Sequence, residues 1–78
     1  MVKAILLLNV TVGKEQQIAQ ALRENNSVIE AMVTFGDFDV CAIVSAENAK
    51  ELGRLVTLEI RKIDGVMKTS TLLEADKY

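Results

Sequence analysis

The chain has 78 residues, of which 50% are hydrophobic and 26% charged, and its nine basic and eleven acidic residues give a net charge of −2. This length predicts one domain over residues 1–78, and the acidic balance argues against a stand-alone nucleic-acid binder, which needs a clustered positive surface. Cys41 is the single cysteine and there is no histidine. An internal disulfide and a conventional zinc site are therefore excluded, and we expect no metal or cofactor.

The apolar run at 4–8 is far shorter than the roughly 20 residues that a bilayer-spanning helix needs. It is also too short for the apolar region of a signal peptide, and no small-residue cleavage region follows it. We therefore expect a cytoplasmic protein without membrane association.

The hydrophobic pattern predicts a regular series of elements. In chain order these are a strand at 3–11, a helix at 14–25, strands at 28–35 and 38–45, a helix at 47–63, a strand at 66–74 and a loose tail at 75–78. Gly13 marks the turn before the first helix, Ser45 is the expected N-cap of the second helix, and Gly65 is its expected stop. We expect Met32 and Met67 to fill the core.

Two of the strands are apolar on both faces. Leu6 and Leu8 alternate with Ile5 and Leu7, and the strand around Cys41 shows the same pattern. Alternate residues of a strand point to opposite sides of the sheet. A strand with one side in water should instead alternate apolar and polar residues. Something other than water is therefore expected on each side of this sheet.

The order β-α-β-β-α-β predicts a ferredoxin-like α+β fold, a four-stranded antiparallel sheet with two helices on one face. Two helices can cover only one face of the sheet, so the apolar residues of the other face are left uncovered. A second copy of the chain is the expected cover, which predicts a dimeric α/β barrel. On the second helix, Lys50 and Arg54 stand near Glu47 and Glu51, which predicts a solvated, salt-bridged face.

Several segments resemble the effector-binding domain of the Lrp/AsnC transcription regulators, called RAM. The turn at 34–39, Thr-Phe-Gly-Asp-Phe-Asp, resembles the family's turn of glycine, any residue, aromatic residue and aspartate. Residues 63–66 resemble its helix exit, and residues 69–71 resemble the Thr-x-Thr of its final strand. Full regulators carry an N-terminal helix-turn-helix domain, and nothing precedes the first strand here. We therefore expect a stand-alone form, for which direct DNA binding is not implied.

The resemblance implies dimers that associate further, from tetramers to decamers, with a small amino-acid effector held between dimers. It also implies that the chain modulates a full-length Lrp/AsnC regulator. By resemblance, Gly36, Asp37, Phe38 and Asp39 on the turn after the second strand and Thr69 and Thr71 on the final strand are ligand-binding residues. Thr34 and Ser70 are added as further hydroxyl groups at the same places.

An amino-acid ligand has two charged ends, and these residue types suit both. Its ammonium group requires a carboxylate, which either Asp37 or Asp39 supplies. Its carboxylate requires main-chain N–H groups, which a glycine turn exposes, or hydroxyl groups.

Other interpretations stay open at this stage. Residues 36–39 make a hairpin turn in any case, and Thr69 and Thr71 are good strand formers. A small dimeric-barrel enzyme, such as a monooxygenase, shares the fold, but no histidine or phosphate-binding loop supports catalysis, so we expect a non-enzyme. An ACT-like amino-acid sensor would instead use the turn at 11–14.

Overall fold

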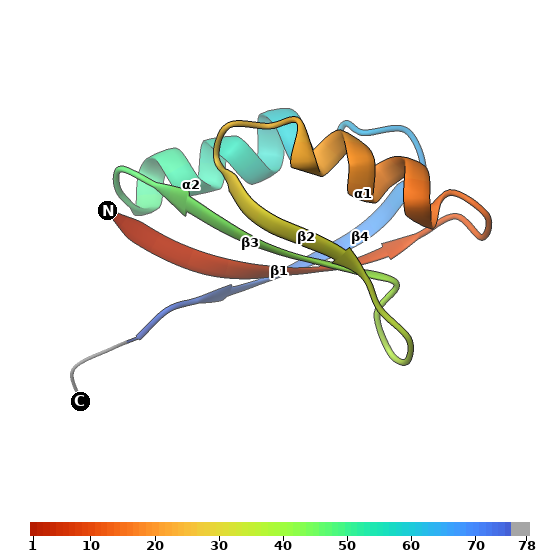
Figure 1. Ribbon diagram of the computed structural model, residues 1–78. Helices are drawn as coiled ribbons and strands as arrows, with labels where there is room; N and C mark the ends of the chain where they lie inside the picture. Colours follow the sequence, from red (N-terminus) through yellow and green to blue (C-terminus); the bar gives the residue numbers. More distant parts are fainter. Residues whose placement is uncertain (76–78) are drawn as a thin grey trace.

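The structure is a computed structural model that describes residues 1–75, so the predicted tail lies outside the described residues from position 76 onward. The elements in chain order are β1 (Val2–Val10), α1 (Glu15–Arg23), β2 (Val28–Val33), β3 (Val40–Ala46), α2 (Ala49–Leu55), the π-helical turn η1 (Val56–Ile60) and β4 (Val66–Leu73). The strands form one antiparallel sheet in the order β2-β3-β1-β4. Both helices lie on the same side of it (Figure 1). The predicted ferredoxin-like fold is confirmed.

The core lies between the helices and one face of the sheet. β1 is central, since it pairs with β3 on one side and with β4 on the other. Its even-numbered side chains from Ala4 to Val10 are buried beneath the helices, and Leu6 and Leu8 are completely enclosed. The helices contribute the opposite half of this core through Ile18, Ala19, Leu22, Leu52, Leu55, Val56 and Ile60.

The predicted N-cap of the second helix is wrong. Ser45 belongs to β3, where it pairs with Lys3 and donates its N–H to the Ser27 carbonyl at 3.0 Å. Strand pairing therefore continues past the expected boundary, and the helix begins later. Asn48 is the actual N-cap, because its Oδ1 accepts the N–H of Glu51 at 2.9 Å.

The second helix is shorter than predicted and ends in a wider turn. The Arg61 N–H donates to the Val56 carbonyl at 2.9 Å, five residues back, which is the hydrogen bond of a π-helix. The extra residue in this turn keeps Ile60 completely buried and turns Glu59 outward, where it accepts a hydrogen bond from Asn25 Nδ2 at 2.7 Å. Gly65 lies in the turn before β4, with φ +99°, rather than at the helix end.

The prediction that Met67 fills the core is also wrong, because its side chain is 73% exposed. The register between β1 and β4 shifts between Asn9 and Val10, and Met67 is the extra residue on β4 at that shift. A residue without a partner in the ladder is free to point away from both strands. Met32 is half-buried on the sheet face that no helix covers.

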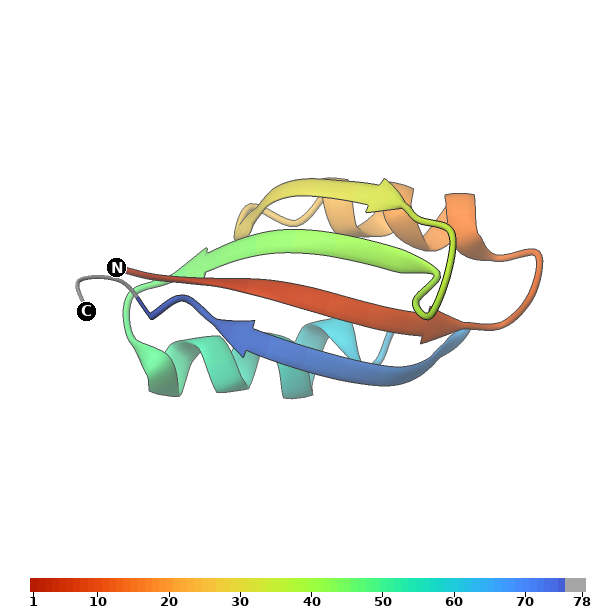
Figure 2. The ribbon, with the colours of Figure 1, turned by 90° about the horizontal axis from the view of Figure 1, so that it is seen from below.

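The loop at 34–39 joins β2 to β3 at one end of the sheet. It drops below the sheet on the side away from the helices (Figure 1) and crosses in front of the end of β1 when the molecule is seen from below (Figure 2). The N-terminus lies at the opposite end of the sheet.

Candidate functional site

The loop at 34–39 is fastened to the end of β1 by three hydrogen bonds. The Asp39 N–H donates to the Leu8 carbonyl at 2.8 Å, and Asp39 Oδ2 accepts the N–H of Val10 at 2.8 Å. Asn9 Nδ2 donates to the main-chain oxygen of Asp37 at 2.9 Å. Three consecutive residues of β1 therefore hold the loop, and two of the three bonds involve a side chain.

The loop is also closed on itself. The N–H of Thr34 donates to the Asp39 carbonyl at 2.9 Å, and its Oγ1 donates to the Phe38 carbonyl at 2.7 Å. Gly36 has φ +133°, a conformation that side chains disfavour, which explains the glycine at this point of the turn. Phe35, next to it, is completely exposed.

An open hollow of about 540 Å³ lies between this loop and the first turn of α1. Its lining combines apolar surface with carboxylate, amide and hydroxyl groups from Glu15, Gln16, Val33, Thr34, Phe35, Gly36 and Asp39. Three of the eight predicted ligand-binding residues therefore share this hollow. The Asp37 side chain is exposed nearby and makes no hydrogen bond or ion pair with the described residues.

The predicted residues of the final strand lie on the other side of β1. Thr69, Ser70 and Thr71 pair with Leu8, Leu7 and Leu6 of β1. Residues opposite one another in an antiparallel pair share a face, so Thr69 and Thr71 lie on the helix side and Ser70 lies on the other side. Within one copy, the width of β1 separates these hydroxyls from the loop.

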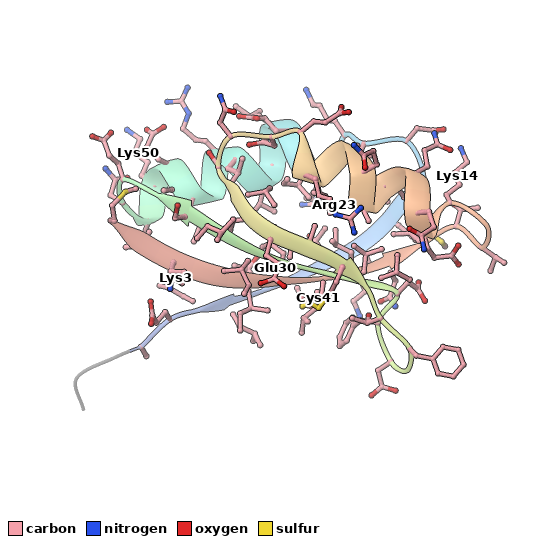
Figure 3. The ribbon with its side chains drawn as sticks, viewed as in Figure 1. Lys3, Lys14, Arg23, Glu30, Cys41 and Lys50 are labelled. Carbon is pink, nitrogen blue, oxygen red and sulfur yellow. The ribbon has the colours of Figure 1, made fainter. Side chains whose placement is uncertain are left out.

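The face of the sheet that no helix covers has an apolar centre. Two rows of side chains cross all four strands on it, Met32–Cys41–Leu7–Ser70 and Glu30–Ile43–Ile5–Leu72. Ile5 is 40% exposed and Leu72 is 53% exposed. Lys3, Glu30 and Cys41 mark this face in Figure 3, on the side away from the helices. The predicted open apolar face is present, and polar and charged residues accompany it.

One ion pair occurs within residues 1–75, where Lys14 Nζ donates to Asp64 Oδ2. The hydrogen bond from Lys14, and then its charge, lower the pKa of the Asp64 carboxyl. The predicted salt bridges on α2 do not form, although Lys50 and Arg54 are exposed as expected. Glu47 precedes the N-cap and so does not share the helical face, and exposed pairs are held only weakly.

Residues 1–75 contain neither a metal-binding cluster nor a helix that could span a membrane. No group of three or more cysteine or carboxylate side chains is arranged to hold a metal ion in this part of the chain. None of the described helices combines the length and apolar character needed to cross a membrane.

The Lrp/AsnC ligand binding domain matches residues 3–77, and the chain belongs to this family. An uncharacterized HTH-type transcriptional regulator from Pyrococcus abyssi is 34% identical over 62 residues, which are 80% of this chain and 41% of that protein. The chain spans 39% to 46% of the length of the curated relatives it matches.

Two solved structures have the same fold at nearly the same size, and a third has the fold within a longer chain. The crystal structure of FFRP-DM1 is 32% identical, with a TM-score of 0.92 over 96% of this chain and 100% of that chain. TTHA0845 from Thermus thermophilus is 31% identical, with a TM-score of 0.92 over 100% of this chain and 98% of that one. The regulator NMB0573 from Neisseria meningitidis, solved as an L-Met complex, shares the fold alone, with 12% identity and a TM-score of 0.87.

Reasoning from sequence missed one residue that shapes this site. Asn9 is half-buried and holds the loop through Asp37, yet it lies in a strand whose apolar alternation draws attention to its other residues. A single amide in an otherwise apolar run was the available signal, because a half-buried amide requires a hydrogen-bond partner. Asn9 therefore joins the set of residues that build the site.

Proposed function

We propose that this domain binds a free amino acid or a related small metabolite and converts binding into a change in how copies of the chain assemble. The observation that carries the proposal is the anchored loop at 34–39 beside its hollow, next to an apolar sheet face without cover. Family membership supports a regulatory role rather than catalysis.

A second copy is the proposed cover of the open face. The apolar centre formed by Ile5, Leu7, Ile43 and Leu72 is the kind of contiguous surface that monomers seldom expose. The same face carries both Lys3 and Glu30. A two-fold interface brings one patch against itself, so a face with both signs of charge can pair with its own copy. Dimers formed this way then associate into larger assemblies.

The ligand site is proposed to form where dimers meet. In this arrangement the loop at 34–39 of one copy faces the edge strand β4 of another, which presents Thr69 and Thr71 on one side and Ser70 on the other. The separation imposed by β1 within one copy is thereby removed. A carboxylate of the loop meets the ligand's ammonium group, and a hydroxyl of the final strand meets its carboxylate. Ligand binding then favours one assembly over another, and this difference is the signal passed to a full-length Lrp/AsnC regulator.

The turn at 11–14, which an ACT-like sensor would use, offers fewer free groups. Thr11 donates its N–H at 2.8 Å and its Oγ1 at 3.3 Å to the Gly65 carbonyl. The N–H of Gly13 is held by Glu15 Oε1 at 3.0 Å, and that of Lys14 by the Thr11 carbonyl at 3.0 Å. These donors are already used within the chain, which favours the loop at 34–39.

The test is a thermal-shift screen with the twenty standard L-amino acids, each at millimolar concentration. A ligand that binds only the folded state raises Tm. We expect at least one amino acid to do so, and Thr71→Val to reduce that shift because it removes one hydroxyl at nearly constant volume. Thr57→Val is the matched control, since Thr57 is exposed on η1, outside the proposed site. A flat response of the unmodified chain to all twenty would contradict the proposal.

A further inference from the structure

The two aspartates of the loop have different surroundings. The carboxylate of Asp37 is exposed and makes no hydrogen bond or ion pair with residues 1–75. Asp39 is half-buried, and its Oδ2 accepts the N–H of Val10 at 2.8 Å. Either aspartate has the charge that an ammonium group requires, but one of them already has a structural partner.

The hydrogen bond from Val10 has a clear physical origin. β1 extends beyond its partner strand, because the ladder between β1 and β3 ends at the pair Leu8 and Val40. The Val10 N–H consequently has no carbonyl of β3 opposite it. The Asp39 carboxylate takes the place of that carbonyl, while the Asp39 N–H continues the ladder one step further by donating to Leu8. The side chain thus fastens the loop where regular pairing stops.

We infer that Asp39 is a positioning residue that fixes the loop on β1, and that Asp37 is the carboxylate that meets the ammonium group of an amino-acid ligand. This inference rests on the proposed function. It assigns anchoring of the loop to one carboxylate and contact with the ligand to the other. Val10 requires only an acceptor, which a neutral amide oxygen also provides. An ammonium group gains most from a charged partner.

Asn9 supports this division of roles. Its Nδ2 donates to the main-chain oxygen of Asp37, so the residue that presents the free carboxylate is itself held in place. A loop fixed before binding avoids the ordering cost that a mobile loop would add. Where the competent loop conformation is populated only a tenth of the time, the apparent Kd rises about tenfold.

Four variants test the inference: Asp39→Ala, Asp39→Asn, Asp37→Asn and Asn48→Ala as a control. Asn48 caps α2, whose first turn lies at the end of the sheet opposite the loop (Figure 1), and its loss lowers global stability without touching the site. Calorimetric titration with each amino acid that raises Tm in the screen gives the binding constants. Hydrogen exchange at the Val10 amide reports independently on the anchor.

We expect Asp39→Ala to weaken binding about tenfold and to lose protection at the Val10 amide. Asp39→Asn should rescue both, because its amide oxygen still accepts that hydrogen bond. Asp37→Asn should weaken binding about tenfold or more while Val10 stays protected. Asn48→Ala should lower Tm without altering the binding constant, which separates positioning from a general loss of stability.

Two results would overturn the inference while leaving the proposed function in place. One is a loss of binding in Asp39→Asn with the Val10 amide still protected, which would make Asp39 the ligand contact. The other is undiminished binding in Asp37→Asn. A wild-type chain that responds to no amino acid would refute the proposed function and the contact role of Asp37 together. The exchange at Val10 would still decide the anchoring role of Asp39.

Discussion

The two faces of the sheet use similar residues in different surroundings. On β1, Leu6 and Leu7 are neighbours of identical chemistry, yet Leu6 is fully buried under the helices and Leu7 is only half-buried on the open face. The helix side is thus completed within one copy. The open side depends on what covers it, so apolar alternation alone does not say which leucine stabilises an isolated chain.

The sharpest test of this contrast is the pair Leu6→Ala and Leu7→Ala. Leu6→Ala should lower the free energy of unfolding by about 2–5 kcal/mol, because it removes buried surface and leaves a cavity. Leu7→Ala should cost clearly less at low protein concentration, where copies are separate, and more as copies associate. Urea denaturation at two protein concentrations measures both. Equal and concentration-independent losses would mean that the two faces do not differ in this way.

The second prediction concerns a variant that disrupts the open face of the sheet and leaves the buried core unchanged. Ile5→Lys places a charge in the apolar row beside Ile43 and Leu72. We expect it to weaken self-association by about 2–4 kcal/mol, the effect of losing a central contact. Circular dichroism should still show a folded chain. Sedimentation at micromolar concentration measures the assembly, and Thr57→Lys, an exposed site on η1, is the matched control. A wild-type chain that sediments as a monomer would contradict both this prediction and the proposed dimer.

The third prediction concerns the packing of the turn before β4 against the start of α1, on the helix side of the sheet. Gly65 has φ +99°, and a Cβ there would stand 2.8 Å from Lys14 Cδ, so Gly65→Ala strains both backbone and packing. We expect a loss of about 1–2 kcal/mol in thermal or urea unfolding. Gly53→Ala is the matched control, because this helical glycine has no atom within 4 Å of an added Cβ. It should stabilise the chain by about 0.5–1 kcal/mol, and a loss at both positions would point to some other cause.

The sequence predicted the element order, the two-faced β1 and the position of the loop, because these follow from local periodicity and turn residues. It did not predict that Ser45 stays in β3, since that depends on pairing with Lys3 across the sheet. The π-helical turn was also not predicted, because the regular spacing of an α-helix was extended through Glu59.

The candidate site was harder to predict than the fold. The sequence placed Asp37 and Asp39 together on one turn but did not distinguish them, because the distinction depends on where β3 stops beside Val10. The hydroxyls of Thr69 and Thr71 were expected near the same ligand, and one copy of the chain holds them apart from the loop. Bringing them together requires contacts between copies, which no local pattern records.

The smallest expected effect tests the one ion pair of the described chain, which joins the turn before α1 to the turn before β4. Lys14 lowers the pKa of Asp64 from its usual value of 3.8. A carboxyl with a lowered folded-state pKa stabilises the protein above its unfolded pKa, and this contribution is lost as pH falls through the lowered value. Asp64→Asn should therefore give a slightly lower Tm than wild type near neutral pH, and the gap should close below pH 3.8.

The effect of Asp64→Asn must stay small because the carboxyl is exposed and water screens the pair. Added salt should narrow the gap further, which separates a charge interaction from a change in packing. A gap that widens as the solution becomes acidic would mean that Asp64 destabilises the folded state. In that case the packing of the Lys14 side-chain carbons beside Gly65, rather than the Lys14–Asp64 ion pair, would hold α1 against the turn before β4.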